Sequence, residues 1–88
     1  MKEMENEIPK ITLRSLELYR DERVPPSGFL RAVLANNLSG AVTRADADNL
    51  LALRSIVYWI NWELFASSWG SYGKVDDWLA EEEYEPRP

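Results

Sequence analysis

A proline pair followed directly by an apolar periodic segment constrains this chain most. Pro25 and Pro26 fix backbone torsions, and Pro25 keeps the preceding Val24 out of the helical region. Ser27 can then cap a helix through its hydroxyl group. We therefore predict a stiff corner that opens into an amphipathic helix, which breaks near Ser39. The stripe of a half-buried helix is formed by Phe29, Leu30, Val33, Leu34 and Leu38.

Two other helices are predicted on either side of this segment. Thr12 is a suitable N-cap for a helix that runs to about Glu22. Asp46 or Asp48 caps the longest helix, from about 47 to 66, and both carboxylates suit its positive N-terminal dipole. The spacing of apolar residues in both segments is typical of helices that pack along one face.

Ser71 is expected to cap a shorter fourth helix that ends near Glu82. No segment alternates apolar and polar residues as a half-buried strand would. The predicted fold is therefore all-α, a small compact bundle of three main helices plus a shorter C-terminal fourth. We expect a flexible arm over 1–9, one helical domain over 10–83 and an extended tail over 84–88.

The amino-acid composition argues against catalysis. The chain contains neither Cys nor His, which removes the thiol nucleophile, the commonest general base and the commonest metal ligand. Glu63 stands on an aromatic-rich helix, and we expect it to face solvent or to pair with a Lys or Arg. The sequence thus predicts a protein that is not an enzyme and that needs no cofactor and no metal.

The distribution of apolar residues predicts a soluble, cytoplasmic protein without a membrane segment. The most apolar stretch, 50–66, is interrupted by polar residues and is shorter than the roughly 20 residues that span a bilayer. The first ten residues are polar and do not resemble a signal peptide.

Charge is unevenly distributed along the chain. Residues 1–44 contain seven basic and six acidic groups, whereas residues 45–88 contain three basic and nine acidic groups. The acidic half repels phosphates and could meet a basic protein surface, which makes Asp76, Asp77, Glu81 and Glu82 candidate partner-binding residues. Nucleic-acid binding is the weaker alternative, and it would use Arg14, Arg20, Arg23, Arg31 and Arg44.

Four tryptophans exceed what the interior of one small domain readily holds. We expect Trp62 and Trp78 in the core. Trp59 projects differently from Trp62 around the helix, so we expect Trp59 and Tyr72 at an interface with a partner.

An apolar seam on the longest predicted helix indicates a possible dimer interface. Its residues are spaced three and four apart over two heptads, which is shorter than a sustained coiled coil. The seam consists of Leu50, Leu53, Val57, Ile60 and Leu64.

The chain also resembles short uncharacterised proteins encoded in phage and prophage genomes. The resemblance rests on PPSGFLRAVLANNL at 25–38, RAD at 44–46, Asn49 and WGS at 69–71. It implies a phage or mobile-element context and carries over no catalytic residue.

The resemblance covers about residues 10–80 and departs from the family pattern at two positions. That pattern has Gly where this chain has Ser27 and Asp where it has Asn37. Ser27 still serves as a cap, whereas the missing Asp at position 37 weakens any argument for a cation or a basic partner there.

Together these features predict a small non-enzymatic accessory protein that acts by protein–protein binding. Its mode of action would be inhibition of a host or defence protein, by steric block or by acidic mimicry of DNA. The alternative is a self-associating structural or scaffold protein that dimerises through the third helix. The sequence leaves the identity of the target open.

Overall fold

The computed structural model describes residues 5–81, and this part of the chain contains six α-helices, one 3₁₀ turn and no strand. The all-α prediction is confirmed, but the division into three main helices and a fourth is not, because the chain is broken more often. The elements are α2 (Lys10–Glu22), α3 (Gly28–Leu34), α4 (Leu38–Arg44), α5 (Ala47–Leu51), α6 (Leu53–Glu63), η1 (Ala66–Ser68) and α7 (Tyr72–Glu81).

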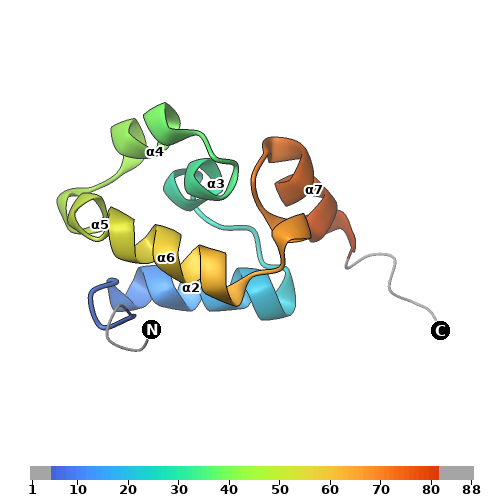
Figure 1. Ribbon diagram of the computed structural model, residues 1–88, viewed down its shortest axis with the longest axis horizontal. Coiled ribbons are helices and arrows are strands. Elements are labelled where there is room, and N and C mark those ends of the chain that lie inside the picture. Colours follow the sequence, from blue (N-terminus) through green and yellow to red (C-terminus); the bar gives the residue numbers. More distant parts are fainter. Residues whose placement is uncertain (1–4, 82–88) are drawn as a thin grey trace.

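The helices are arranged around the pair α2 and α6, which run side by side in the same direction (Figure 1). Thr12 donates a hydrogen bond to Asn49 near one end of this pair, and Arg20 contacts Glu63 at the other end. Helices α4 and α5 lie at one end of the long axis and α7 lies at the other (Figure 1), across a molecule that measures 42 × 27 × 19 Å.

The N-terminal boundary of the domain differs from the prediction. Helix α2 begins at Lys10 after Pro9, so Thr12 is a buried helical residue rather than the N-cap. Residues 5–9 are packed on the domain rather than forming part of a flexible arm, because Ile8 is buried and Glu5 accepts a hydrogen bond from a core tryptophan.

The corner after α2 forms as predicted. Ser27 caps α3, since its Oγ accepts a hydrogen bond from the Leu30 backbone N–H at 3.3 Å. The predicted break near Ser39 is wrong, because α3 already ends at Leu34. Asn36 has a left-handed φ of 65°, a conformation that Asn tolerates better than most residues.

Asn37 then starts the next helix. Its side-chain oxygen accepts a hydrogen bond from the Gly40 backbone N–H at 3.0 Å and caps α4. A Cβ atom at Gly40 would lie 2.5 Å from the Asn37 amide nitrogen, so a larger residue there would have to displace the capping side chain. The predicted second helix is therefore divided in two, because Asn36 takes a left-handed conformation and Asn37 then caps α4.

The longest predicted helix is divided in two. Asp46 caps α5 as expected, through a 2.8 Å hydrogen bond from the Asn49 backbone N–H. Ala52, with φ −93° and ψ 4°, then separates α5 from α6, and Leu64 takes an extended conformation that ends α6 at Glu63. The chain changes direction at Ala52, so the predicted dimer seam does not lie on one straight helix.

Helix α7 is tied to the rest of the domain by buried hydrogen bonds. The predicted Ser71 cap is confirmed by a bond from the Lys74 backbone N–H. Trp78 donates its indole N–H to the Tyr19 carbonyl at 2.8 Å, and the Tyr19 hydroxyl donates to the Ser68 carbonyl at 2.6 Å. These bonds join α2, η1 and α7 into one packed unit.

The core lies between α2, α3, α6 and α7. No helix in the described range is both long and apolar enough to cross a lipid bilayer. The largest fully buried side chains are Leu16, Tyr19, Leu30, Leu34, Ile56, Trp59, Ile60 and Val75.

Candidate functional site

Helix α6 has two chemically different sides. Its inner side packs in the core through Ile56, Trp59 and Ile60. Other residues of α6, including Tyr58 and Trp62, project to the solvent side, as expected for a period of 3.6 residues. An exposed aromatic surface therefore begins on a helix whose other side packs in the core.

The interface role predicted for Trp59 is wrong. This side chain is 1% exposed, and its indole N–H donates to the Glu5 carboxylate at 3.1 Å. The Arg20 guanidinium lies 5.3 Å from the ring centroid and also pairs with Glu63 at 3.1 Å. Trp59 is thus a core residue, and Glu63 pairs with an arginine, which was one of its two expected environments.

The core role predicted for Trp62 is also wrong, because this side chain is 71% exposed. Trp62 follows Tyr58 by one helical turn, and Tyr58 follows Arg54 by another, so the three side chains form one row on α6. The Arg54 guanidinium lies 5.5 Å from the Tyr58 ring centroid. We call Arg54, Tyr58 and Trp62 the aromatic stripe.

The other predicted core tryptophan is placed correctly. Trp78 is buried between the Tyr19 ring and the Phe65 ring, with centroid distances of 6.4 and 6.2 Å. The Arg23 guanidinium lies 3.5 Å from the Trp78 ring centroid. Phe65 itself is largely exposed just beyond the end of α6, so a further aromatic side chain reaches solvent there.

Tyr72 and Asp76, both predicted to bind a partner, take part in the contact between α3 and α7. Arg31 pairs with Asp76 at 2.9 Å and lies 5.1 Å from the Tyr72 ring centroid. Asn37 donates a hydrogen bond to the Tyr72 hydroxyl at 3.0 Å. Both side chains remain partly open to solvent, but their contacts serve the domain itself.

The remaining acidic candidates lie on or beyond α7. Asp77 is exposed, Glu81 is the last residue of the helix, and Glu82 lies outside the described residues. The structure therefore places Asp76 and Asp77 on one short helix.

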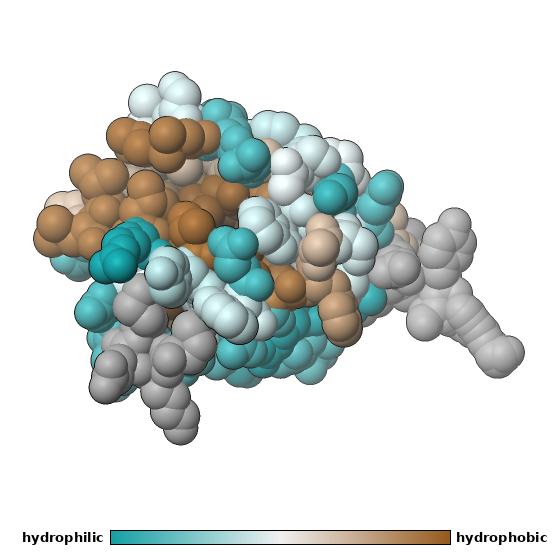
Figure 2. Space-filling view, in the orientation of Figure 1, coloured by the Kyte–Doolittle hydropathy of each residue, from teal (hydrophilic) through white to brown (hydrophobic). Residues whose placement is uncertain are grey.

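A second apolar surface covers α4, α5 and the start of α6, and Figure 2 shows it as a continuous brown area over these helices. Leu38 and Leu50 are 69% and 46% exposed, and Val42 and Val57 are also exposed. A small hollow of about 70 Å³ between α3, α4 and α6 is lined partly by Leu53 and Val57. We call Leu38, Val42, Leu50, Leu53 and Val57 the aliphatic face.

The predicted seam is divided by this arrangement. Leu50, Leu53 and Val57 belong to the aliphatic face, whereas Ile60 and Leu64 are buried in the core. Three of the five residues therefore lie toward solvent and two lie in the core, so they do not form the single seam that the sequence predicts.

The arginines of the first half are dispersed and form contacts within the domain. Arg14 pairs with Glu17, and Arg20 and Arg31 are part of the ion pairs already described. Arg23 lies against the Trp78 ring, and Arg44 donates to the Gly40 carbonyl.

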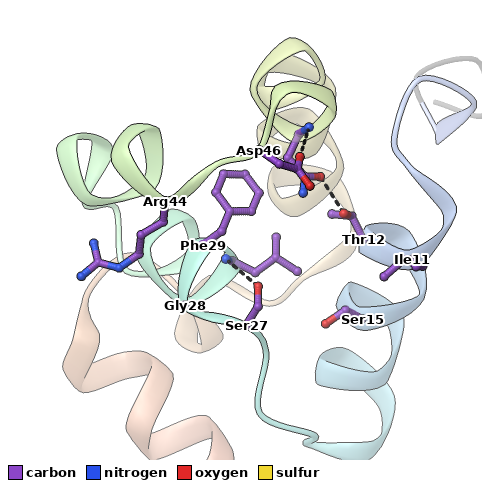
Figure 3. A pocket seen from close by; sticks show the side chains of 10 residues that line it. Ile11, Thr12, Ser15, Ser27, Gly28, Phe29, Arg44 and Asp46 are labelled. Atoms are coloured by element: carbon purple, nitrogen blue, oxygen red, sulfur yellow. Dashed lines mark hydrogen bonds between the residues drawn. The ribbon is translucent and has the colours of Figure 1, made fainter.

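An open groove lies between α2 and the segment from α3 to α5 (Figure 3). Residues within 27–30 and 44–49 line much of it, with Phe29 at its centre and Arg44 and Ile11 on opposite sides (Figure 3). Its polar side chains serve the fold: Ser27 and Asp46 cap helices, and Thr12 bonds to Asn49.

Shifted pKa values are found in the core and on α2. Burial raises the pKa of Tyr19 to about 12, and the hydrogen bond from Arg20 lowers the pKa of the Asp21 carboxyl. Among the described residues, no group of three carboxylates is placed to hold a metal ion.

Neither a known protein family, nor a curated protein, nor a solved structure matches this chain. Sequence reasoning missed the exposure of Trp62, Leu38 and Val42. The signal for Trp62 was present, because it shares a helical row with the charged Arg54, which marks the solvent side.

Proposed function

We propose that this chain is a small non-catalytic accessory protein, of the phage or mobile-element kind, that acts by binding another protein through the aromatic stripe. The observation that supports this role is the chemistry of the stripe. Arg, Tyr and Trp are the residue types enriched among binding hot spots, and here Arg54, Tyr58 and Trp62 form one exposed row. A soluble domain has no folding reason to keep an indole largely in water.

The target that we propose is a host enzyme or defence complex, inhibited by steric block. Acidic mimicry of DNA is less favoured, because Asp76 is already paired with Arg31. Self-association is a second candidate role, and a different surface, the aliphatic face, favours it.

The test is affinity capture from host lysate with three baits: the wild-type chain, Trp62→Ala and Ile11→Ala. Ile11 is 85% exposed on α2, so its truncation removes a comparable exposed apolar side chain elsewhere. A hot-spot tryptophan contributes about 2 kcal/mol or more to binding, so Trp62→Ala should lower capture of the specific partner more than about tenfold. Ile11→Ala should capture the partner as the wild type does.

Two results would contradict the proposal. One is the absence of any protein retained specifically by the wild-type bait. The other is equal retention by wild type and Trp62→Ala, which would show that the bound protein uses another surface.

A further inference from the structure

We propose that residues 5–8 form a releasable latch and that the site they fill on α6 accepts a partner segment of the same chemistry. Such a segment carries two carboxylates in alternate positions, followed by an aliphatic side chain. The inference is independent of the aromatic stripe, and it starts from the contacts that hold the latch on the domain.

Three side chains hold the latch in place. Glu5 accepts a hydrogen bond from the Trp59 indole N–H at 3.1 Å, and Glu7 accepts one from the Ser55 hydroxyl at 2.5 Å. Ile8 packs in the core and is 3% exposed. Because Ser55 and Trp59 are also buried, the latch supplies the acceptors that two donors of α6 need.

Among the described residues, no backbone hydrogen bond ties the latch to another element. The bond from the Ile8 N–H to the Glu5 carbonyl, at 3.1 Å, stays inside the latch. Pro9 follows, and because it has no N–H and disfavours a helical conformation of Ile8, α2 begins only at Lys10. The latch can therefore leave its site without unwinding α2 and without breaking the backbone hydrogen bonds of α6.

The outer edge of the latch is loosely packed. Asn6 and Glu7 are exposed, and an open hollow lies between the latch and the junction of α5 and α6 (Figure 1). Asp48 lines this hollow together with Glu7, and two carboxylates at one edge repel each other. Segments held by few buried contacts open locally while the rest of a domain stays folded, and we expect the latch to open in this way.

The contacts of the latch also define what else can fill the site. Once the latch leaves, the site presents the Trp59 indole N–H, the Ser55 hydroxyl and the apolar slot of Ile8. Carboxylates suit these donors, because hydrogen bonds to a charged acceptor are stronger than those between neutral groups. A partner segment of this pattern replaces two carboxylates with two others, so the exchange leaves the charge at the site unchanged.

Hydrogen exchange of the Trp59 indole proton, measured by NMR on the wild-type chain, tests the release. We expect this proton to exchange at least about tenfold faster than global unfolding allows, with little dependence on urea, because only the latch has to open. Val75→Ala is the matched control, since Val75 is fully buried on α7. This variant should raise the global unfolding constant by about tenfold and leave the exchange rate of Trp59 unchanged.

A chain that carries Glu5→Ala, Glu7→Ala and Ile8→Ala together tests the site. It should remain folded, and its Trp59 indole resonance should move from the wild-type position. A peptide with the sequence of residues 5–9, blocked at both ends, should return that resonance in a saturable manner, with a dissociation constant of about 1 mM because it makes few contacts. The same peptide with Glu5→Ala and Glu7→Ala should bind at least about tenfold more weakly.

Any of three results would overturn the proposal. One is acceleration of Trp59 exchange by Val75→Ala to the same degree as global unfolding. Another is loss of folded structure in the triple variant by circular dichroism, since the domain should remain folded without the latch. The third is equal binding, or no binding, of the two peptides. Trp62→Ala should change none of these results, so failure of the aromatic stripe and failure of the latch would be seen separately.

Discussion

The layer formed by α2 and α6 and the layer formed by α4 and α5 are stabilised in different ways. The first buries large side chains such as Tyr19 and Trp59 and satisfies their polar groups with hydrogen bonds across the chain. The second buries almost nothing and depends on the caps Asn37 and Asp46, which act within three residues. Long-range packing thus gives one layer its stability, and local backbone capping gives the other its shape.

The largest expected difference is between two tryptophans of the same helix. Trp59→Ala should lower the free energy of unfolding by about 3–5 kcal/mol, because it leaves a cavity in the core. Trp62→Ala should change it by no more than about 0.5 kcal/mol, because this side chain is exposed. Urea unfolding of both variants measures the difference, and similar losses for the two would contradict the separation of the inner and outer sides of α6.

Alkaline pH should act on the packed layer through Tyr19. Burial raises the pKa of its phenol from 10.0 to about 12, so the folded chain keeps a proton that the unfolded chain releases. This contribution to stability is complete below pH 10 and is lost as the pH rises through about 12, where the loss reaches about 2 kcal/mol.

Tyr19→Phe provides the control for this prediction. The variant leaves the buried Ser68 carbonyl without its donor, which costs about 1–3 kcal/mol below pH 10. Its stability deficit relative to wild type should shrink toward pH 12. Parallel losses of stability in the two proteins would show that Tyr19 does not titrate as expected.

The capped layer should respond more weakly and more locally. Asp46→Ala removes the cap of α5 and should cost about 1 kcal/mol. Backbone amides of α4 and α5 should exchange with deuterium faster than those around Trp59, and the variant should accelerate exchange in α5 most. Uniform protection across both layers in the wild type would argue against the contrast between them.

The smallest effect is expected at the exposed contact between α3 and α7. Asp76→Asn removes the ion pair with Arg31. The Asp76 side chain is 59% exposed and the Arg31 side chain is 38% exposed. Exposed pairs contribute between zero and about 1 kcal/mol, and less at high salt. The melting temperature of the variant should therefore stay close to that of the wild type. A large decrease would indicate that the position of α7 depends on this ion pair more than on Trp78.

The features that sequence predicted well are those decided within a few residues. Ser27, Asp46 and Ser71 each cap a helix as expected, because a cap bonds to a backbone N–H three residues ahead. The proline corner at Pro25 and Pro26 likewise follows from restrictions on adjacent torsions.

Several of the features that sequence missed depend on distant partners. Ala52 is an excellent helix former, so no local signal indicated the break there, and α5 is held by the bond between Thr12 and Asn49. Arg54 on the helical row of Trp62 marks the solvent side of α6, but the partners that enclose Trp59, which are Glu5 and α2, are not visible in the sequence of α6 alone.

The same asymmetry determines where the candidate site lies. Residue types indicate an aromatic binding surface, and Arg54 marks the side of α6 that faces solvent. Charge alone indicates the acidic candidates, whereas Arg31, which engages Asp76, lies on a different helix far earlier in the chain.

The contrast between the two tryptophans of α6 also gives the protein an optical signature. Water reorients around the excited state of an exposed indole, so Trp62 should emit at longer wavelength than Trp59, which is enclosed by the core. The emission wavelength of Trp62 therefore reports whether the aromatic stripe is exposed to water or covered by a ligand, with no label attached to the chain. A ligand that covered this stripe would shift the spectrum to shorter wavelength while the contribution of Trp59 stayed constant.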